Sequence, residues 1–246
     1  MVDPRTTVIL DRLRSINRII AVSSGKGGVG KSMVATTLAL SLVHEGCKVG
    51  LFDLDFTSPS THLILGAENA QPKEDKAIIP PEVKGLVYMS LIYYSRDQAA
   101  PLRGADVSNA LIELLSVTQW GKLDYLIIDM PPGIGDVVLD LLRLVKRIEF
   151  LIVTTPSLLA FETVKKQAML LRDLNVPVIG ILENMKMNNS ESIQSETEKL
   201  GLRHLGEIKF DPRVEDAIGD ERELLGTLIG KKIQELVAAK VLWLGA

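Results

Sequence analysis

Seven short apolar runs divide the chain, and longer stretches with helical spacing separate most of them. Several runs are apolar at almost every position, which is typical of strands covered on both faces. Strands that alternate with crossover helices predict an α/β fold, here a doubly wound, mostly parallel sheet flanked by helices on both faces. The predicted strands cover residues 19–23, 48–55, 86–91, 123–130, 149–155, 176–184 and 204–210.

Three segments interrupt this rhythm. Residues 67–84 are predicted to form a surface excursion, and residues 186–200 are strongly polar, without a role that the pattern indicates. A last helix is predicted over roughly 222–242, followed by the apolar end of the chain. Because no long linker interrupts the alternation, residues 1–246 are predicted to form a single domain.

The composition narrows the function classes. The 246 residues are 46% hydrophobic with a net charge of −3, which argues against broad attraction to nucleic acid or anionic membranes. No apolar run reaches the roughly 18 residues that a membrane span needs. The first residues lack the apolar core of a signal peptide, so a cytoplasmic location is predicted.

The chain has few cysteine and histidine side chains. Cys47 is the single cysteine, which excludes an intramolecular disulfide and any cluster built from the cysteines of one chain. We expect Cys47 to be a buried packing residue. His44, His62 and His204 are scattered along the sequence, which argues against a metal site made from them.

The segment SSGKGGVGKS, residues 23–32, matches the P-loop pattern GxxxxGKS in full. It follows an apolar run and precedes a helical stretch, which is the context that a P-loop requires. In such a loop the glycines turn backbone N–H groups toward phosphates, Lys31 reaches the β- and γ-phosphates, and Ser32 binds Mg²⁺. A P-loop of this type needs one lysine, so Lys26 is surplus.

Two further strand ends carry carboxylates. Asp129 ends a predicted buried strand, where open α/β sheets bind ligands, and we interpret it as a magnesium ligand rather than a turn former. Asp53 and Asp55 end another strand, and either could position the attacking water or contact Mg²⁺ through water. Alternation puts both on one face, so the pattern does not separate them. Asn184 could contact an adenine edge, but spacing alone favours a turn former.

These motifs resemble the deviant P-loop of the MinD/ParA/nitrogenase-iron-protein ATPases. Within that class the chain is most similar to the Mrp/ApbC/Nbp family of iron–sulfur cluster carrier ATPases. The resemblance covers nearly the whole chain and implies the fold of those P-loop NTPases and a homodimer that closes around two ATP molecules. The motifs that carry it are SGKGGVGKS (24–32), DLDFTSPS (53–60), WGKLDYLIIDMPPGIGD (120–136), TTPSLLAFETVKK (154–166), VPVIGILENM (176–185) and FDPRV (210–214).

The resemblance also implies roles for single residues. Lys26 corresponds to a signature lysine that reaches the partner's nucleotide, and Asp55 to the switch I aspartate that handles water or magnesium. Lys26, Lys31 and Asp55 are then the catalytic residues, and Ser32, Asp55 and Asp129 the magnesium ligands. Residues 133–136 match switch II. The residues predicted to bind ATP are Gly25, Gly27, Gly28, Val29, Gly30, Lys31, Ser32, Met33, Asn184 and Pro212.

Departures from the family pattern qualify the prediction. The family usually follows ENM with a cysteine pair that holds a bridging [4Fe–4S] cluster between two subunits, whereas this chain has none there. A bound iron–sulfur cluster is therefore not expected. Ile134 stands where a threonine is typical, which removes a switch II hydroxyl, and Lys209 stands where a proline is typical.

The leading hypothesis is a slow, homodimeric Mg·ATP-hydrolysing switch that assists metallocluster maturation without holding the cluster itself. Its partner would be a cysteine-bearing relative or an iron–sulfur client protein. The alternative is a MinD/ParA-like positioning switch that recruits a partner at a membrane or on DNA. The C-terminal stretch bears on this choice, because an amphipathic helix with nearby lysines can bind a membrane surface. Its apolar positions with helical spacing are Ile229, Ile233, Leu236, Val237, Val241 and Leu244, and the lysines are Lys231, Lys232 and Lys240. Packing of that helix on the sheet is favoured. A small-molecule kinase is disfavoured because it has no use for Lys26.

Overall fold

A computed structural model of the chain describes residues 4–93, 105–187 and 192–241. Ten strands and ten helices are found in this part of the chain, with a 3-10 turn at Leu91–Tyr93. The strands are β1 Ile16–Ser24, β2 Val49–Asp53, β3 Lys73–Asp75, β4 Ala77–Ile79, β5 Glu82–Val83, β6 Leu86–Ser90, β7 Leu123–Asp129, β8 Ile148–Thr154, β9 Val178–Lys186 and β10 His204–Lys209. The helices are α1 Arg5–Leu13, α2 Lys31–His44, α3 Thr61–Leu65, α4 Ala105–Val117, α5 Asp136–Leu144, α6 Leu158–Asp173, α7 Ser192–Lys199, α8 Arg213–Asp216, α9 Glu221–Gly226 and α10 Leu228–Ala238.

The predicted parallel sheet is confirmed. Eight strands form one sheet in the order β10-β9-β8-β1-β7-β2-β6-β5, and every pairing is parallel except that of β5 with β6. β7 and β8 follow each other along the chain but flank β1 on opposite sides. The strand order therefore reverses at β1, and ligands bind at such a switch point in doubly wound sheets.

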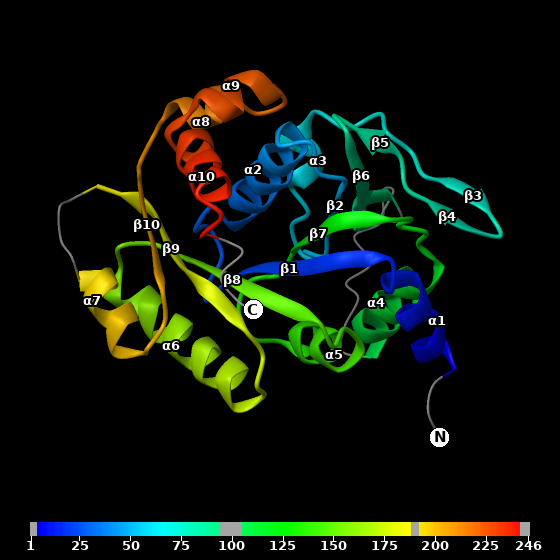
Figure 1. The fold of residues 1–246 in the computed structure, drawn as a ribbon, viewed down its shortest axis with the longest axis horizontal. Coiled ribbons are helices and arrows are strands. Elements are labelled where there is room, and N and C mark those ends of the chain that lie inside the picture. The colour runs from blue at the N-terminus through cyan, green and yellow to red at the C-terminus, as the bar shows by residue number, and fades with distance from the viewer. Residues whose placement is uncertain (1–3, 94–104, 188–191, 242–246) are drawn as a thin grey trace.

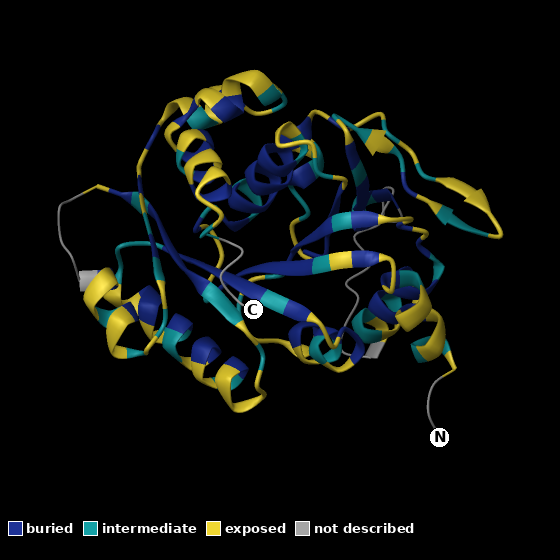
Figure 2. Ribbon diagram, in the orientation of Figure 1, coloured by how far each residue is buried: buried dark blue, intermediate teal, exposed yellow. Residues whose placement is uncertain are grey.

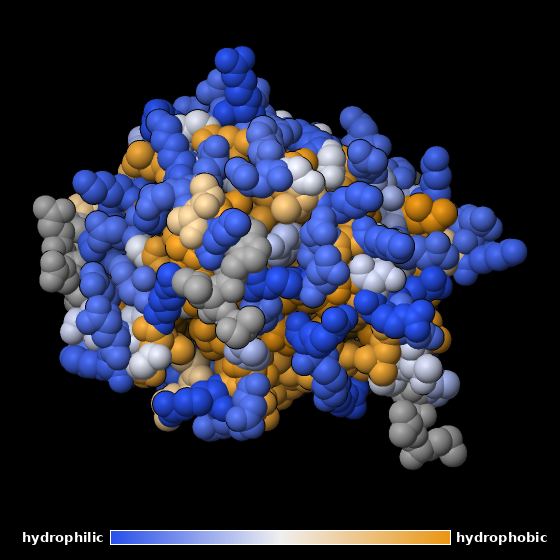
Figure 3. Space-filling view, in the orientation of Figure 1, coloured by the Kyte–Doolittle hydropathy of each residue, from blue (hydrophilic) through white to orange (hydrophobic). Residues whose placement is uncertain are grey.

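Helices cover both faces of the sheet, as Figure 1 shows, with α2, α3 and α8–α10 on one side and α1 and α4–α7 on the other. The central strands are buried along nearly their whole length (Figure 2). α2 is apolar almost all round because it lies between the sheet and α10, which buries it on two sides. Hydrophilic residues predominate on the surface in Figure 3, where apolar side chains gather mainly between α5 and α6.

The predicted C-terminal helix is wrong as a single element. α9 ends at Gly226, and Thr227 adopts an extended conformation with ψ 172° before α10 begins. The Thr227 hydroxyl accepts a hydrogen bond from Gly230 N at 3.2 Å, which caps the new helix. Gly230 allows the corner to be tight, since a Cβ there would lie 2.4 Å from the Leu225 carbonyl oxygen. The segment was expected to pack on the sheet, but α10 packs mainly on α2 and contacts the sheet at β10, with Ile229, Ile233, Leu236 and Val237 buried.

Other segments carry structure that the hydrophobic pattern did not predict. The excursion at 67–84 lies at the surface as expected, but it contains the antiparallel pair β3–β4 and strand β5. The polar segment 186–200 contains α7, and α1 precedes the first strand. Cys47 is half-buried against the core rather than fully buried, and burial raises the pKa of its thiol. Leu244, the last position of the predicted helical spacing, lies outside the described residues.

Candidate nucleotide site

The P-loop leaves the sheet at the end of β1 and enters α2 at Lys31. Gly28 and Gly30 have φ of 75° and 80°, the left-handed region that side chains with a Cβ rarely adopt. The Ser24 hydroxyl donates a hydrogen bond to the Lys26 carbonyl at 2.9 Å, which closes the start of the loop. The loop thus presents backbone amides at a helix N-terminus, where anions are stabilised.

Close neighbours explain two of the loop glycines. A Cβ on Gly25 would lie 2.8 Å from the Thr163 Cβ of α6. A Cβ on Gly30 would lie 2.4 Å from the amide nitrogen of Asn184, at the end of β9. These glycines therefore let α6 and β9 approach the loop, in addition to any contact with phosphates.

A buried ion pair lies under the loop. Lys31 Nζ donates to Asp129 Oδ1 at 2.6 Å and lies 3.2 Å from the Ser32 hydroxyl oxygen. The two charged side chains are only 6% and 0% exposed. Burial raises the pKa of Asp129 to about 6, against the opposing effect of Lys31. Asp129 Oδ2 has no hydrogen-bond partner among the described residues, so one buried carboxylate oxygen remains available to a ligand.

Asp53 and Asp55, which the pattern did not separate, have different surroundings. Asp53 is fully buried and accepts hydrogen bonds from Asp55 N at 3.0 Å, Thr61 N at 3.1 Å and the Thr61 hydroxyl at 2.7 Å. Asp55 Oδ1 accepts from the amides of Thr57 and Ser58, at 3.0 and 3.1 Å, and its residue is 6% exposed. Asp53 is thus occupied in holding the start of α3, whereas Asp55 shapes the turn that follows β2.

The segment after Asp129 is tied to the P-loop. Met130 N donates to the Val22 carbonyl at 3.0 Å, and Gly133 N donates to the Ser24 carbonyl at 2.8 Å. Gly133 has φ of 82°, and Ile134 beside it is exposed. Backbone hydrogen bonds therefore join residues 130–133 to β1 and to the start of the P-loop.

Asn184 is hydrogen-bonded to the loop backbone, and Pro212 lies at the start of α8. The Asn184 amide nitrogen donates to the Val29 carbonyl at 2.9 Å, and its residue is buried. Pro212 is exposed at the start of α8, and its position is set by Asp211, which sequence reasoning missed. Asp211 binds the Arg213 guanidinium at 2.8 Å and accepts from Leu228 N at 2.9 Å. The spacing of Asp211 and Arg213, two residues apart in the sequence, was the signal from which this ion pair could have been predicted.

Lys26, the surplus lysine, is exposed at the tip of the loop. Exposed apolar side chains lie on the two segments that the loop contacts: Ile134 after β7, and Leu158 and Leu159 at the start of α6. Leu159 is 85% exposed, which is unusual for a leucine beside a polar loop. Val29 is buried, while Met33 is partly buried against the core.

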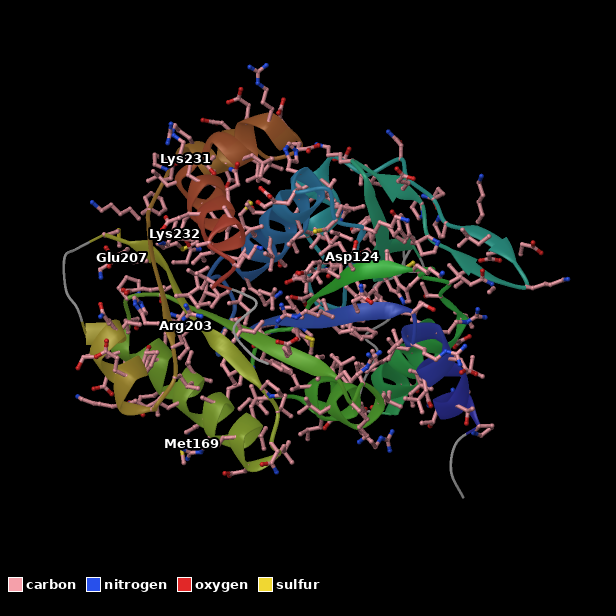
Figure 4. The ribbon with its side chains drawn as sticks, in the orientation of Figure 1. Asp124, Met169, Arg203, Glu207, Lys231 and Lys232 are labelled. Atoms are coloured by element: carbon pink, nitrogen blue, oxygen red, sulfur yellow. The ribbon has the colours of Figure 1, made fainter. Side chains whose placement is uncertain are left out.

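Other features do not add to this site. A half-open cavity of about 360 Å³ lies between α6, the segment that leads into β9 and the turn that follows α7, and Met169 on its α6 side is labelled in Figure 4. Within residues 4–93, 105–187 and 192–241, no group of three or more His, Cys, Asp or Glu side chains could hold a metal ion. None of the described helices has both the length and the apolar character that crossing a membrane requires.

The residues brought together fit a magnesium nucleotide. The loop supplies left-handed glycines and a helix N-terminus, Lys31 supplies a buried cation, and Asp129 keeps an unpaired oxygen beside the Ser32 hydroxyl. Hydroxyl and carboxylate oxygens are the ligands that Mg²⁺ prefers. Together with the sheet topology, this site defines a P-loop nucleoside triphosphatase.

Comparison with known protein families places the chain more narrowly. A model of the ParA group, described as NUBPL iron-transfer P-loop NTPase, matches residues 15–240. The chain belongs to this family.

Curated relatives agree with that assignment. An iron–sulfur cluster carrier protein of Pseudomonas fragi is 43% identical over 72% of this chain and 63% of the relative. The protein of the same name from Escherichia coli K12 is 43% identical over 72% of this chain and 48% of its own length. The chloroplastic Fe-S cluster assembly factor HCF101 of Arabidopsis thaliana is 44% identical over 85% of this chain and 41% of its own length. The chain thus spans about two fifths to two thirds of these relatives.

Solved structures share the fold. A nucleotide-binding protein of Archaeoglobus fulgidus, solved in complex with ADP, superposes with a TM-score of 0.77 at 30% identity, over 89% of this chain and 92% of that one. The cell division ATPase MinD of Pyrococcus furiosus superposes with a TM-score of 0.67 at 20% identity, over 91% and 99% of the two chains. The second similarity concerns the fold alone.

Proposed function

We propose that this protein is a Mg·ATP-hydrolysing homodimeric switch that assists the maturation of iron–sulfur proteins. The buried Lys31–Asp129 pair under a complete P-loop carries the proposal. A buried charge pair with an unpaired carboxylate oxygen is costly unless a ligand completes it, and perturbed carboxylates in such places cluster at functional sites.

In the proposed complex, the backbone amides of residues 27–32 and Lys31 bind the phosphates. Ser32 and Asp129 would hold Mg²⁺, which neutralises the β- and γ-phosphate oxygens when it is bound. Asn184 would contact the adenine and Pro212 would flank it. Gly25, Gly27, Gly28, Val29, Gly30 and Met33 would form the walls of the phosphate site.

Hydrolysis would depend on positioning and charge, because phosphoryl transfer requires little covalent chemistry from the protein. Asp55 lies on the turn after β2, beside the strand that ends in Asp129, and would orient the attacking water. Leu54 N donates to the Asp129 carbonyl at 2.9 Å, so the two carboxylates move with one backbone unit. ATP and water would give ADP and phosphate.

A second copy of the chain would complete the site. Lys26 is exposed and is not needed within its own loop, so we assign it to the partner's nucleotide, where it adds positive charge at the transition state. The exposed Ile134, Leu158 and Leu159 around the loop would be buried in that closed dimer. Closure and chemistry would then be coupled.

The iron–sulfur role comes from the relatives, whose names describe cluster carriers and assembly factors. With Cys47 as its single cysteine, this chain cannot supply a cysteine cluster site from one copy. The cluster would therefore be cargo of a cysteine-bearing relative or of an iron–sulfur client protein. Relatives include a chloroplastic factor, and the cytoplasmic location of this chain stays a prediction.

A MinD/ParA-like positioning role is the second candidate, since MinD shares the fold. The observation against it is that the apolar face of α10 is already buried against α2, which leaves it unavailable for a membrane surface. Vesicle sedimentation with and without ATP tests this role, and nucleotide-dependent pelleting would favour it.

A pull-down tests the proposed function. Wild-type protein locked with a non-hydrolysable ATP analogue should recover iron–sulfur proteins from native extract, and Lys31→Ala should recover fewer of them. Recovery of membrane or chromosome-positioning factors in place of iron–sulfur proteins would contradict the proposal. Steady-state phosphate release by the purified chain tests hydrolysis separately.

A further inference from the structure

A second charge cluster lies at the end of β9, outside the phosphate site, with Lys186 and Glu183 buried and Glu207 43% exposed. Lys186 Nζ lies 3.4 Å from Glu183 Oε2 and forms a closer ion pair with Glu207 of β10. The side chains of Lys186 and Glu183 are 5% and 0% exposed. Burying a lysine beside carboxylates costs desolvation free energy. A chain that carries such a cluster therefore gains something else from it, and the neighbouring residues indicate that role.

The cluster depends on a break in the strand. In a regular strand residues 183 and 186 face opposite sides of the sheet. Met185 has φ of 59°, a strained conformation for a residue with a Cβ, and Lys186 reaches Glu183 across this kink. Phe210 N donates to the Lys186 carbonyl at 3.1 Å, which fastens the kinked end of β9 to the chain after β10.

Asn184 lies between the paired residues. Its amide nitrogen donates to the Val29 carbonyl at 2.9 Å, and because a carbonyl only accepts, this bond fixes which way the amide faces. The Oδ1 acceptor and the second N–H remain for a ligand. One acceptor and one donor side by side complement the N6 and N7 edge of adenine, whereas guanine presents two acceptors there.

We propose that Glu183, Lys186 and Glu207 form a positioning clamp that holds Asn184 against the P-loop and thereby sets selectivity for adenine over guanine nucleotides. This inference rests on the proposed function, in which Asn184 contacts the base. The clamp itself touches neither substrate nor metal. It acts by holding the Met185 kink, and with it the orientation of the Asn184 amide.

Neighbouring charges enclose the clamp. His204 Nε2 lies 3.8 Å from Glu183 Oε2 on one side. Figure 4 labels Glu207 on β10 and Lys232 on the neighbouring α10, and Lys232 lies over Gly206, so that a Cβ there would be 2.8 Å from Lys232 Cε. Two carboxylates hold the one buried lysine of this cluster, and no helix N-terminus such as that beside Lys31 is found among its contacts in the described residues.

The test compares competition binding of ATP and GTP to the full chain. Glu183→Gln keeps the side-chain shape, and Lys186→Met in the Glu183→Gln background avoids an unpaired buried glutamate. Each should lower the ATP/GTP affinity ratio by about tenfold, the size of one bidentate base contact. KM for ATP should rise while kcat stays within about twofold, and Lys186→Arg should retain the wild-type ratio.

Two controls keep the outcomes distinct. Lys165→Gln removes the ion pair with Glu196 of α7, at 2.7 Å, and should leave the ratio unchanged. Asn184→Ala should lower the ratio as much as the clamp variants do. If Asn184→Ala lowers the ratio and the folded clamp variants do not, the clamp is wrong while the proposed base contact stands. If Asn184→Ala leaves the ratio unchanged while ATP still binds, the base contact fails and the clamp inference fails with it.

Discussion

Two buried lysines, Lys31 and Lys186, lie close to the carboxyl edge of the sheet. Their surroundings differ, and we propose that Lys31 binds phosphate whereas Lys186 positions a neighbouring residue. Lys31 pairs with Asp129 and lies within electrostatic reach of Asp53, at the N-terminus of α2, where backbone amides add positive charge. Lys186 lies between two carboxylates from neighbouring strands. The first lysine lies beside backbone amides and an unpaired carboxylate oxygen and can still attract a polyanion, whereas the second lies between two carboxylates with no such amides beside it in the described part of the chain.

The same chemistry therefore serves binding at one place and positioning at the other. An acidic excess around a lysine cancels its attraction for phosphate and leaves a rigid link between strands. A single carboxylate with one unpaired oxygen instead leaves the lysine and the metal-binding group available together. Variants at each lysine should consequently fail in different ways.

The largest effect is expected for Lys31→Ala. Removal of the charge that neutralises the phosphates should lower the rate of hydrolysis by about a hundredfold or more, as loss of one preorganised donor does. ATP affinity should fall as well, measured by calorimetry. The fold should survive, because burial lets Asp129 take up a proton when its partner is gone, and circular dichroism checks this.

Asp129→Asn should abolish the effect of Mg²⁺ on nucleotide affinity, because an amide is a much weaker magnesium ligand than a carboxylate. The measurement is ATP affinity with Mg²⁺ and with EDTA. Asp124→Asn is the matched control, since Asp124 lies at the opposite end of β7 (Figure 4) and accepts from Lys48 N at 2.8 Å. A variant at 129 that keeps the full magnesium effect would contradict the assignment.

Gly30→Ala should disturb the contact between the P-loop and Asn184 at the end of β9. Its φ of 80° is strained for alanine, and the new Cβ would lie 2.4 Å from the Asn184 amide nitrogen. We expect a loss of about 1–3 kcal/mol in the free energy of unfolding, measured by urea titration, together with weaker ATP binding. Gly27→Ala is the control, because nothing lies within 4 Å of a Cβ there, and its stability should change by less than about 0.5 kcal/mol.

The smallest effect concerns pH and the clamp. The pKa of His204 is lowered mainly by burial and then by the positive charge of Lys186. The negative charges of Glu207 and Glu198 raise this pKa, and the positive charge of Lys232 lowers it slightly further. The folded state then binds fewer protons than the unfolded state, so the free energy of unfolding should fall as pH drops below about 6.5. Solvent screening keeps this below about 1 kcal/mol.

His204→Gln should remove that part of the pH dependence, measured by urea titration between pH 7.5 and about 5.5. Glu183, whose pKa is raised by burial, remains in the variant. His44→Gln is the control, because His44 pairs with Glu221 at an exposed site. An unchanged slope in His204→Gln would show that the imidazole is not coupled to folding.

The sequence predicts the parallel sheet well because its central strands are buried on both faces and read as continuous apolar runs. The P-loop is equally visible, since its glycines and lysine have fixed spacing. Other features depend on contacts distant in sequence. The corner at Thr227, the different surroundings of Asp53 and Asp55, and the pairing of Lys186 with Glu207 all arise from elements that meet only in the folded chain.

The helix α1 and the hairpin β3–β4 were missed for other reasons. The strands β3 and β4 have three residues each and no buried position, so they leave little hydrophobic periodicity, whereas α1 is amphipathic with Ile9 and Leu13 buried and its spacing was overlooked. Asn184 shows the same dependence on context, because spacing alone favours a turn former, whereas the structure fixes its amide on the Val29 carbonyl.

The central claim is that Lys26 acts in the neighbouring copy, and a mixing experiment tests it most directly. Lys26→Ala and Lys31→Ala should each hydrolyse ATP very slowly alone. In an equimolar mixture, one site of each mixed dimer has Lys31 from one copy and Lys26 from the other. If Lys26 acts on the partner's nucleotide, the mixture should hydrolyse ATP well above the rate of either variant. A mixture that shows only the average of the two variants, although the dimers exchange subunits, would contradict this role of Lys26.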